Sequence, residues 1–122
     1  MANPFVHIEL HTKDITKAKA FYSKLFDWSL EDLPMPDGAG TYTMINVGEG
    51  TGGGMFMNSD PKVLPHWLAY VGVKDIVMST NKARELGATI AQDVMDVGEY
   101  GRMSVIIDPT GAAFAMWESK AA

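Results

Sequence analysis

The chain contains no cysteine among its 122 residues. This absence excludes disulfides, thiolate metal ligands and a thiol nucleophile, and it fits a reducing cytoplasm, where we expect the protein to reside. Arginine is also scarce, with only Arg84 and Arg102, and the net charge is −5. Because nucleic acids and anionic membranes are bound by clustered cations, we expect neither of them as a partner.

Long apolar runs are missing as well. No stretch approaches the roughly 20 apolar residues that span a bilayer. The N-terminal segment Met1–Phe5 lacks the basic segment and apolar run of a signal peptide. What remains is a chain that is 47% hydrophobic and 20% charged, the balance of an ordinary globular protein. We therefore expect a single compact domain over residues 1–122.

An internal repeat organises the chain. Lys13-Asp14-Ile15 recurs as Lys74-Asp75-Ile76, an offset of 61 residues. The same offset, without a gap, relates the pairs Leu25/Leu86, Gly40/Gly101, Ile45/Ile106, Gly50/Gly111 and Met55/Met116. A fixed period is the signature of a repeated structural unit. It predicts a first module over residues 4–57, a linker over 58–65 and a second module over 66–118.

Each module shows the same order of patterns. The spacing predicts strands over 5–11 and 66–73, each followed by an acidic N-cap (Asp14, Asp75) and a helix. In the first helix, Ala18, Phe21, Tyr22 and Leu25 follow the spacing of a buried stripe. Three strands are then expected in each half, over 28–32, 41–47 and 52–57, and over 88–94, 101–107 and 112–118. The Gly52-Gly53-Gly54 run predicts a strand that another backbone approaches closely.

These features resemble the vicinal oxygen chelate superfamily, which includes glyoxalase I, bleomycin resistance proteins and extradiol dioxygenases. The likeness rests on the paired modules, the helix running from Lys13 to Trp28, the Asp108-Pro109-Thr110-Gly111 turn and the Pro65–Tyr70 stretch. It covers residues 5–118 and points to a glyoxalase-like bacterial subgroup. The resemblance implies an α+β fold in which two tandem β-α-β-β-β modules pair into an eight-stranded open cup-like barrel.

Metal-bearing members of that superfamily place ligands on the first and last strand of each module. Carried onto this chain, the resemblance implies the positions His7, Gly54, Leu68 and Ala115. Only the histidine can bind a cation, far short of the three or four protein ligands that such sites need. We therefore predict no metal cofactor. A register shift of two residues would instead bring in His66, Glu118 or Glu9.

Strand alternation places Glu9 and His11 on the same face as His7. We expect His7 and Glu9 to point into the cup, and Glu9 to approach Tyr70 across the module interface. His11, at a strand end, is expected to be exposed to solvent. The residues predicted to bind a ligand are His7, Glu9, His66, Leu68, Tyr70, Met103, Ala115 and Trp117. His7 and Glu9 can be read as a hydrogen-bonded core pair, as a binding pair, or as a general base oriented by a carboxylate.

Three hypotheses for the function follow. The first is metal-independent binding of a small organic molecule in the cup between the modules, by a homodimer. The second is a glyoxalase-like lyase, isomerase or dioxygenase that uses His7 and Glu9 as catalytic residues. The third is a structural or interaction domain whose cup is filled by its own side chains.

Overall fold

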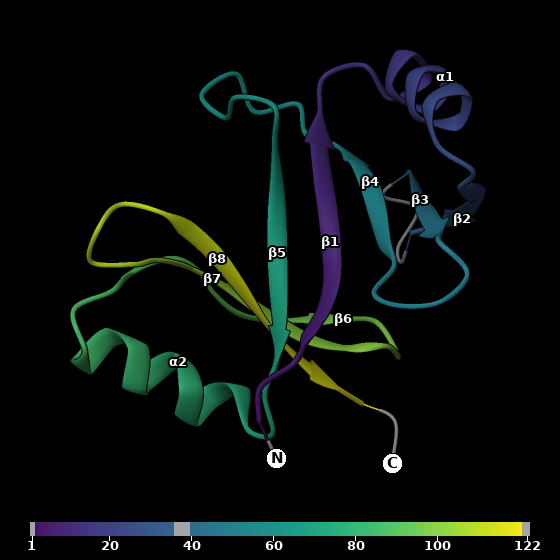
Figure 1. The fold of residues 1–122 in the computed structure, drawn as a ribbon. Coiled ribbons are helices and arrows are strands. Elements are labelled where there is room, and N and C mark those ends of the chain that lie inside the picture. Colours follow the sequence, from purple (N-terminus) through teal and green to yellow (C-terminus); the bar gives the residue numbers. More distant parts are fainter. Residues whose placement is uncertain (1, 36–39, 121–122) are drawn as a thin grey trace. The chain divides into compact units, whose positions relative to one another are not determined.

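The β-α-β-β-β order occurs twice along the chain. The computed structural model describes residues 2–35 and 40–120 (Figure 1). The first module contains β1 (Phe5–Thr12), α1 (Ile15–Leu25), β2 (Ser29–Pro34), β3 (Thr41–Asn46) and β4 (Gly53–Met57). The second contains β5 (His66–Gly72), α2 (Ile76–Glu85), β6 (Thr89–Val97), β7 (Gly101–Ile107) and β8 (Ala113–Ser119). The predicted α+β fold with two tandem modules is confirmed.

The chain forms two compact units. One is His7–Leu68, and the other joins Met1–Val6 to Ala69–Ala122. The strand order in the first unit is β2-β3-β4-β1, and in the second it is β5-β8-β7-β6. In each unit the first strand runs parallel to the last (β1 with β4, β5 with β8), while the hairpin strands are antiparallel. The N-terminal residues join the second unit because the Gly72 amide donates to the Pro4 carbonyl over 2.9 Å.

Both helices begin where the sequence predicts. A carboxylate oxygen of Asp14 accepts from the Lys17 amide, and one of Asp75 accepts from the Met78 amide, each over 3.0 Å. These bonds satisfy amides of the first turn that have no partner within the helix. α2 ends before Gly87, whose φ of 102° is the left-handed conformation that glycine adopts at low cost.

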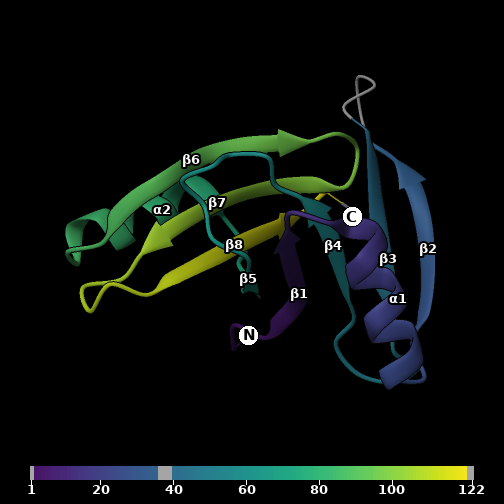
Figure 2. The same ribbon diagram turned by 90° about the horizontal axis from the view of Figure 1, so that it is seen from above.

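The core of the first unit lies between α1 and its sheet. Leu10, Ile45 and Met55 are buried there, with Ala18 and Tyr22 of α1 packed against them. Figure 2 shows α1 beside the sheet that β2, β3 and β4 form. The predicted buried stripe of α1 is wrong in part, because Phe21 and Leu25 are 57% and 55% exposed. The helix therefore meets the sheet along a narrower face than its spacing predicts.

The second unit packs its helix more deeply. Ile76 and Thr80 of α2 are buried, and the Thr80 hydroxyl shares a hydrogen bond of 2.9 Å with the Ser104 hydroxyl of β7. Glu118 of β8 accepts from the Ile76 amide over 2.9 Å and so supports the start of α2. Among the residues that the structure describes, neither helix is long and apolar enough to cross a membrane.

Candidate functional site

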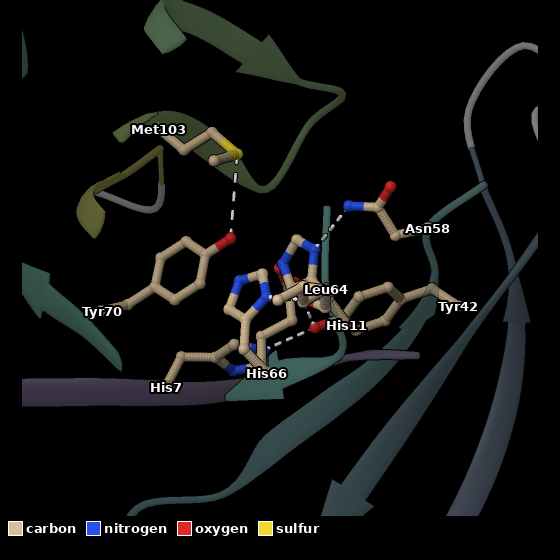
Figure 3. A network of polar contacts seen from close by, with 9 residues as sticks. His7, His11, Tyr42, Asn58, Leu64, His66, Tyr70 and Met103 are labelled. Carbon is tan, nitrogen blue, oxygen red and sulfur yellow. Dashed lines mark hydrogen bonds and ion pairs between the residues drawn. The ribbon is translucent and has the colours of Figure 1, made fainter. Parts of the chain in front are cut away.

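The two faces of β1 carry different chemistry. Leu10 faces α1 in the core, whereas His7, Glu9 and His11 lie on the opposite face and take part in one hydrogen-bonded network. This is the period-two alternation of a strand. Figure 3 shows His7 and His11 converging with side chains from β3, the linker and β5.

Tyr42 of β3 is the centre of this network. Its hydroxyl donates to Oε2 of Glu9 over 2.7 Å, and it also lies 2.7 Å from Nε2 of His7. Because the single hydroxyl proton goes to the carboxylate, His7 must donate its own Nε2 proton to the Tyr42 oxygen. In the neutral ring this leaves Nδ1 as the basic nitrogen of His7. The Tyr42 hydroxyl therefore connects His7 to Glu9 through two hydrogen bonds.

His11 extends the network at the other carboxylate oxygen. Its Nε2 lies 2.7 Å from Oε1 of Glu9, and its Nδ1 lies 3.0 Å from the side-chain nitrogen of Asn58. The Asn58 amide orientation is set by its Oδ1, which accepts from the Asp60 amide over 3.0 Å. Asn58 therefore donates to Nδ1 of His11, and His11 donates to Glu9 from Nε2. The expectation that His11 is exposed is wrong, since its side chain is only 15% exposed.

His66 completes the cluster from the start of β5. Its ring stacks on that of His11, with centroids 4.7 Å apart and planes 18° apart. Its Nδ1 donates to the Leu64 carbonyl over 2.7 Å, which holds the ring in place. All three histidines of the protein therefore belong to the first unit, with His7 and His11 bonded to Tyr42 and Glu9 and His66 stacked on His11.

Burial affects the protonation of His7. Desolvation lowers the pKa of His7 below its ordinary value of 6.5, and the nearby Glu9 carboxylate partly offsets that shift by raising the pKa. His7 is therefore neutral near pH 7. The Glu9 side chain is 12% exposed and accepts from both Tyr42 and His11, so a carboxylate is held by charge-assisted hydrogen bonds.

Burial and the Glu9 carboxylate together determine how His7 titrates. In an NMR titration, His7 should titrate below 6.5, and Glu9→Gln should lower the pKa of His7 further because the charge that raises it is gone. Glu31→Gln, the same change at an exposed position on the edge strand β2, should leave the pKa of His7 unchanged. A His7 pKa that does not respond to Glu9→Gln would show that the carboxylate has no electrostatic influence on it.

The residues at the implied metal positions do not fit a metal ion. A Cβ on Gly54 would collide with the hydroxyl and ring of Tyr42, so a ligating side chain has no space there. Leu68 and Ala115 are buried apolar residues that supply no ligand atom. Within residues 2–35 and 40–120, no three histidine or carboxylate side chains are grouped to hold a metal. Of the residues that a register shift would bring in, Glu118 accepts from the Ile76 amide and forms an ion pair with Arg102, 3.1 Å away.

The remaining predicted residues lie in the second unit. Tyr70 is buried, and its hydroxyl donates to the sulfur of Met103 over 3.9 Å. Ala115 is the β8 partner of Tyr70, and Trp117 is the β8 partner of Met103. These four residues are therefore neighbours on β5, β7 and β8. The expected approach of Glu9 to Tyr70 stays a prediction.

Tyr42, the residue that links His7 to Glu9, was not among the predicted site residues. A signal for it was present, because the offset of 61 residues makes Tyr42 the counterpart of Met103, which was predicted. Asn58 gave no comparable signal, since it lies in the linker and its role depends on how the linker folds back beside His11.

Comparisons with known proteins agree with this architecture. A family model described as the Glyoxalase/Bleomycin resistance protein/Dioxygenase superfamily matches residues 5–116. The "Putative glyoxylase CFP32" of Mycobacterium bovis is 36% identical over 115 residues, which cover 92% of this chain and 44% of that protein. The anthracycline biosynthesis protein DauV of a Streptomyces species is 29% identical over 127 residues, covering 89% and 44%. The chain thus spans less than half the length of these relatives.

Solved structures share the fold at low sequence identity. A hypothetical protein of Bacillus halodurans, BH1468, superposes with a TM-score of 0.76 at 15% identity, over 100% of this chain and 98% of the other. Methylmalonyl-CoA epimerase from Mycobacterium tuberculosis gives 0.70 at 15% identity, over 94% and 87%. The family match over residues 5–116 shows that the chain belongs to the glyoxalase/bleomycin resistance protein/dioxygenase superfamily.

Proposed function

We propose that this protein binds a small organic molecule without a metal ion, at the face of the first unit that carries His7, Tyr42 and Glu9. The observation that carries this proposal is the Tyr42 side chain. It lies over Gly54, where the family resemblance implies a metal ligand, and its hydroxyl joins His7 to Glu9. Polar groups held by one another in this way are oriented before a ligand arrives, which lowers the entropic cost of binding.

The charges of the network favour a particular kind of ligand. His7 is neutral and Glu9 is the acid that accepts both neighbouring protons, so the site has a net negative character. An anionic ligand would be repelled by the carboxylate at short range. The proposed ligand is therefore a neutral or cationic molecule whose hydroxyl, carbonyl or amine can hydrogen-bond to the histidine or the phenol.

The test is ligand-observed NMR on protein treated with EDTA, using a panel of neutral aldehydes, epoxides, hydroxy ketones and catechols. At least one compound should bind without added metal, and Tyr42→Phe should weaken it by about tenfold, since the ring stays while one hydrogen bond is lost. Tyr100→Phe makes the same change at an exposed turn of the second unit and should have no effect.

Thermal unfolding with Zn²⁺, Ni²⁺ and Mn²⁺ should show no saturable stabilisation. A stabilisation that saturates at one ion per chain and disappears in His7→Ala would defeat the metal-independent proposal, as would compounds that bind only after a metal is added.

A second candidate function is proton transfer by the same residues. It is favoured by the lowered pKa of His7, which keeps the imidazole neutral and able to accept a proton. The neutral His7 imidazole would take the proton, while Tyr42 and Glu9 would stabilise the resulting imidazolium through Nε2. The CFP32 relative is named for a glyoxylase activity, and epimerases share the fold. Turnover of one panel compound, reduced about a hundredfold or more in His7→Ala, would establish this function.

A further inference from the structure

A separate cavity lies on the other face of the first unit's sheet, beneath the C-terminal half of α1. Its volume is about 310 Å³, at the lower end of the range for small-molecule pockets. Ile8, Ile45 and Val47 form its aliphatic wall. Ile8 follows His7 in β1 and so points to the opposite side of the sheet. This cavity is therefore distinct from the polar network around Tyr42.

The other large side chains that line the cavity are aromatic. Tyr22 stacks on Trp28 with ring centroids 5.8 Å apart, Phe26 lies 4.8 Å from Trp28, and Trp67 meets Trp28 edge-on at 6.4 Å. Rings at these separations touch one another, so they form a continuous wall and leave no space between them for a cation. The rings and the aliphatic side chains together line the cavity, which is called the slot below.

The second module shows that the fold does not need these rings. The offset of 61 residues places Ala83, Gly87 and Thr89 where the first module has Tyr22, Phe26 and Trp28. The second module folds with those small residues and still buries Ile76 of its helix completely. The second module therefore packs its helix on its sheet without rings at these positions, whereas in the first module Tyr22 and Trp28 also pack against the core.

The slot is open to solvent and uncharged. Phe26 and Trp67 on its rim are 44% and 39% exposed, and no residue of α1 is fully buried. Among residues 2–35 and 40–120, those that line the slot carry no charge. We propose that this slot binds a flat, uncharged molecule of one or two fused aromatic rings, at a site independent of the His7, Tyr42 and Glu9 network. Such a ligand would bury its faces against rings on one side and branched aliphatic side chains on the other.

Indole is the probe for this site, followed by two-dimensional NMR of the methyl groups. Saturable shifts should appear at the methyls of Ile8, Ile45 and Val47, with a Kd of about 0.1–1 mM, the range expected for a ligand of this size. The methyls of Val105 and Ile107 in the second unit should not move. 1-Naphthoate should bind at least about tenfold more weakly than naphthalene, because the slot offers its carboxylate no partner.

A larger side chain at Val47 should block the slot, and the same substitution at Val77 is the matched control. Val47→Phe should weaken indole binding at least about tenfold, while Val77→Phe, the same change at an exposed position of α2, should leave it within about twofold. Shifts that do not saturate, that are absent from Ile8 and Ile45, or that persist unchanged in a folded Val47→Phe protein would overturn the proposal. If Val47→Phe does not fold, the methyl map of the wild-type protein decides alone. His7→Ala should leave indole binding unchanged, which separates this site from the proposed function.

Discussion

Replacing Gly53 with alanine should destabilise the protein by about 3–4 kcal/mol in urea unfolding. Gly53 is the β4 partner of Ile8 in the parallel pair of β1 and β4. A Cβ built on Gly53 would collide with the carbonyl oxygen of Ile8, which is backbone and cannot rotate away. The two strands would have to separate, and the bond of 3.1 Å from the Ile8 amide to the Gly52 carbonyl would be strained.

Comparison with the second module indicates that the need for glycine at this strand position is specific to the first module. The counterpart of Gly53 at the offset of 61 residues is Phe114, a large side chain at the same strand position. The close approach is therefore a property of β1 and β4 and is not required by the module as such. A Gly53→Ala protein within about 1 kcal/mol of wild type would show that the strands are not held this close.

Replacing Gly54 with alanine should cost about 2–3 kcal/mol for a different reason. The added Cβ would collide with the ring and hydroxyl of Tyr42, a side chain that can rotate to another conformation. The phenol would be displaced from His7 and Glu9, and the largely buried Glu9 carboxylate would lose a charge-assisted hydrogen bond. Binding of any compound that depends on Tyr42 should be lost together with the stability, as NMR titration of the folded variant would show.

Much of the fold could be predicted because its signals are local. Asp14 and Asp75 cap the helices as predicted, and Gly87 ends the second. The repeat then predicts the second module from the first. The buried stripe of α1 was predicted less well, because the spacing of Phe21 and Leu25 is helical whether or not a sheet covers them.

The site was harder to predict than the fold. Alternation along one strand was enough to place His7 and Glu9 on a common face. The residue that joins them, Tyr42, comes from a strand more than thirty residues away, and its position depends on the pairing of β3 with β4. The exposure of His11 was misjudged for a similar reason. Asn58 and His66 cover it only after the linker has folded back.

The central claim is that the Tyr42 ring occupies the place of the metal ligand implied at Gly54. Its most direct test is a double-mutant cycle between Gly54 and Tyr42, measured as free energies of unfolding. If the Tyr42 ring lies over Gly54, the Gly54→Ala penalty of about 2–3 kcal/mol should fall below about 1 kcal/mol in a Tyr42→Ala background. Gly53→Ala, whose clash is with backbone, should keep its full penalty in that background. Equal Gly54→Ala penalties with and without the ring would contradict the account, since Tyr42 would then not occupy the place of the implied metal ligand.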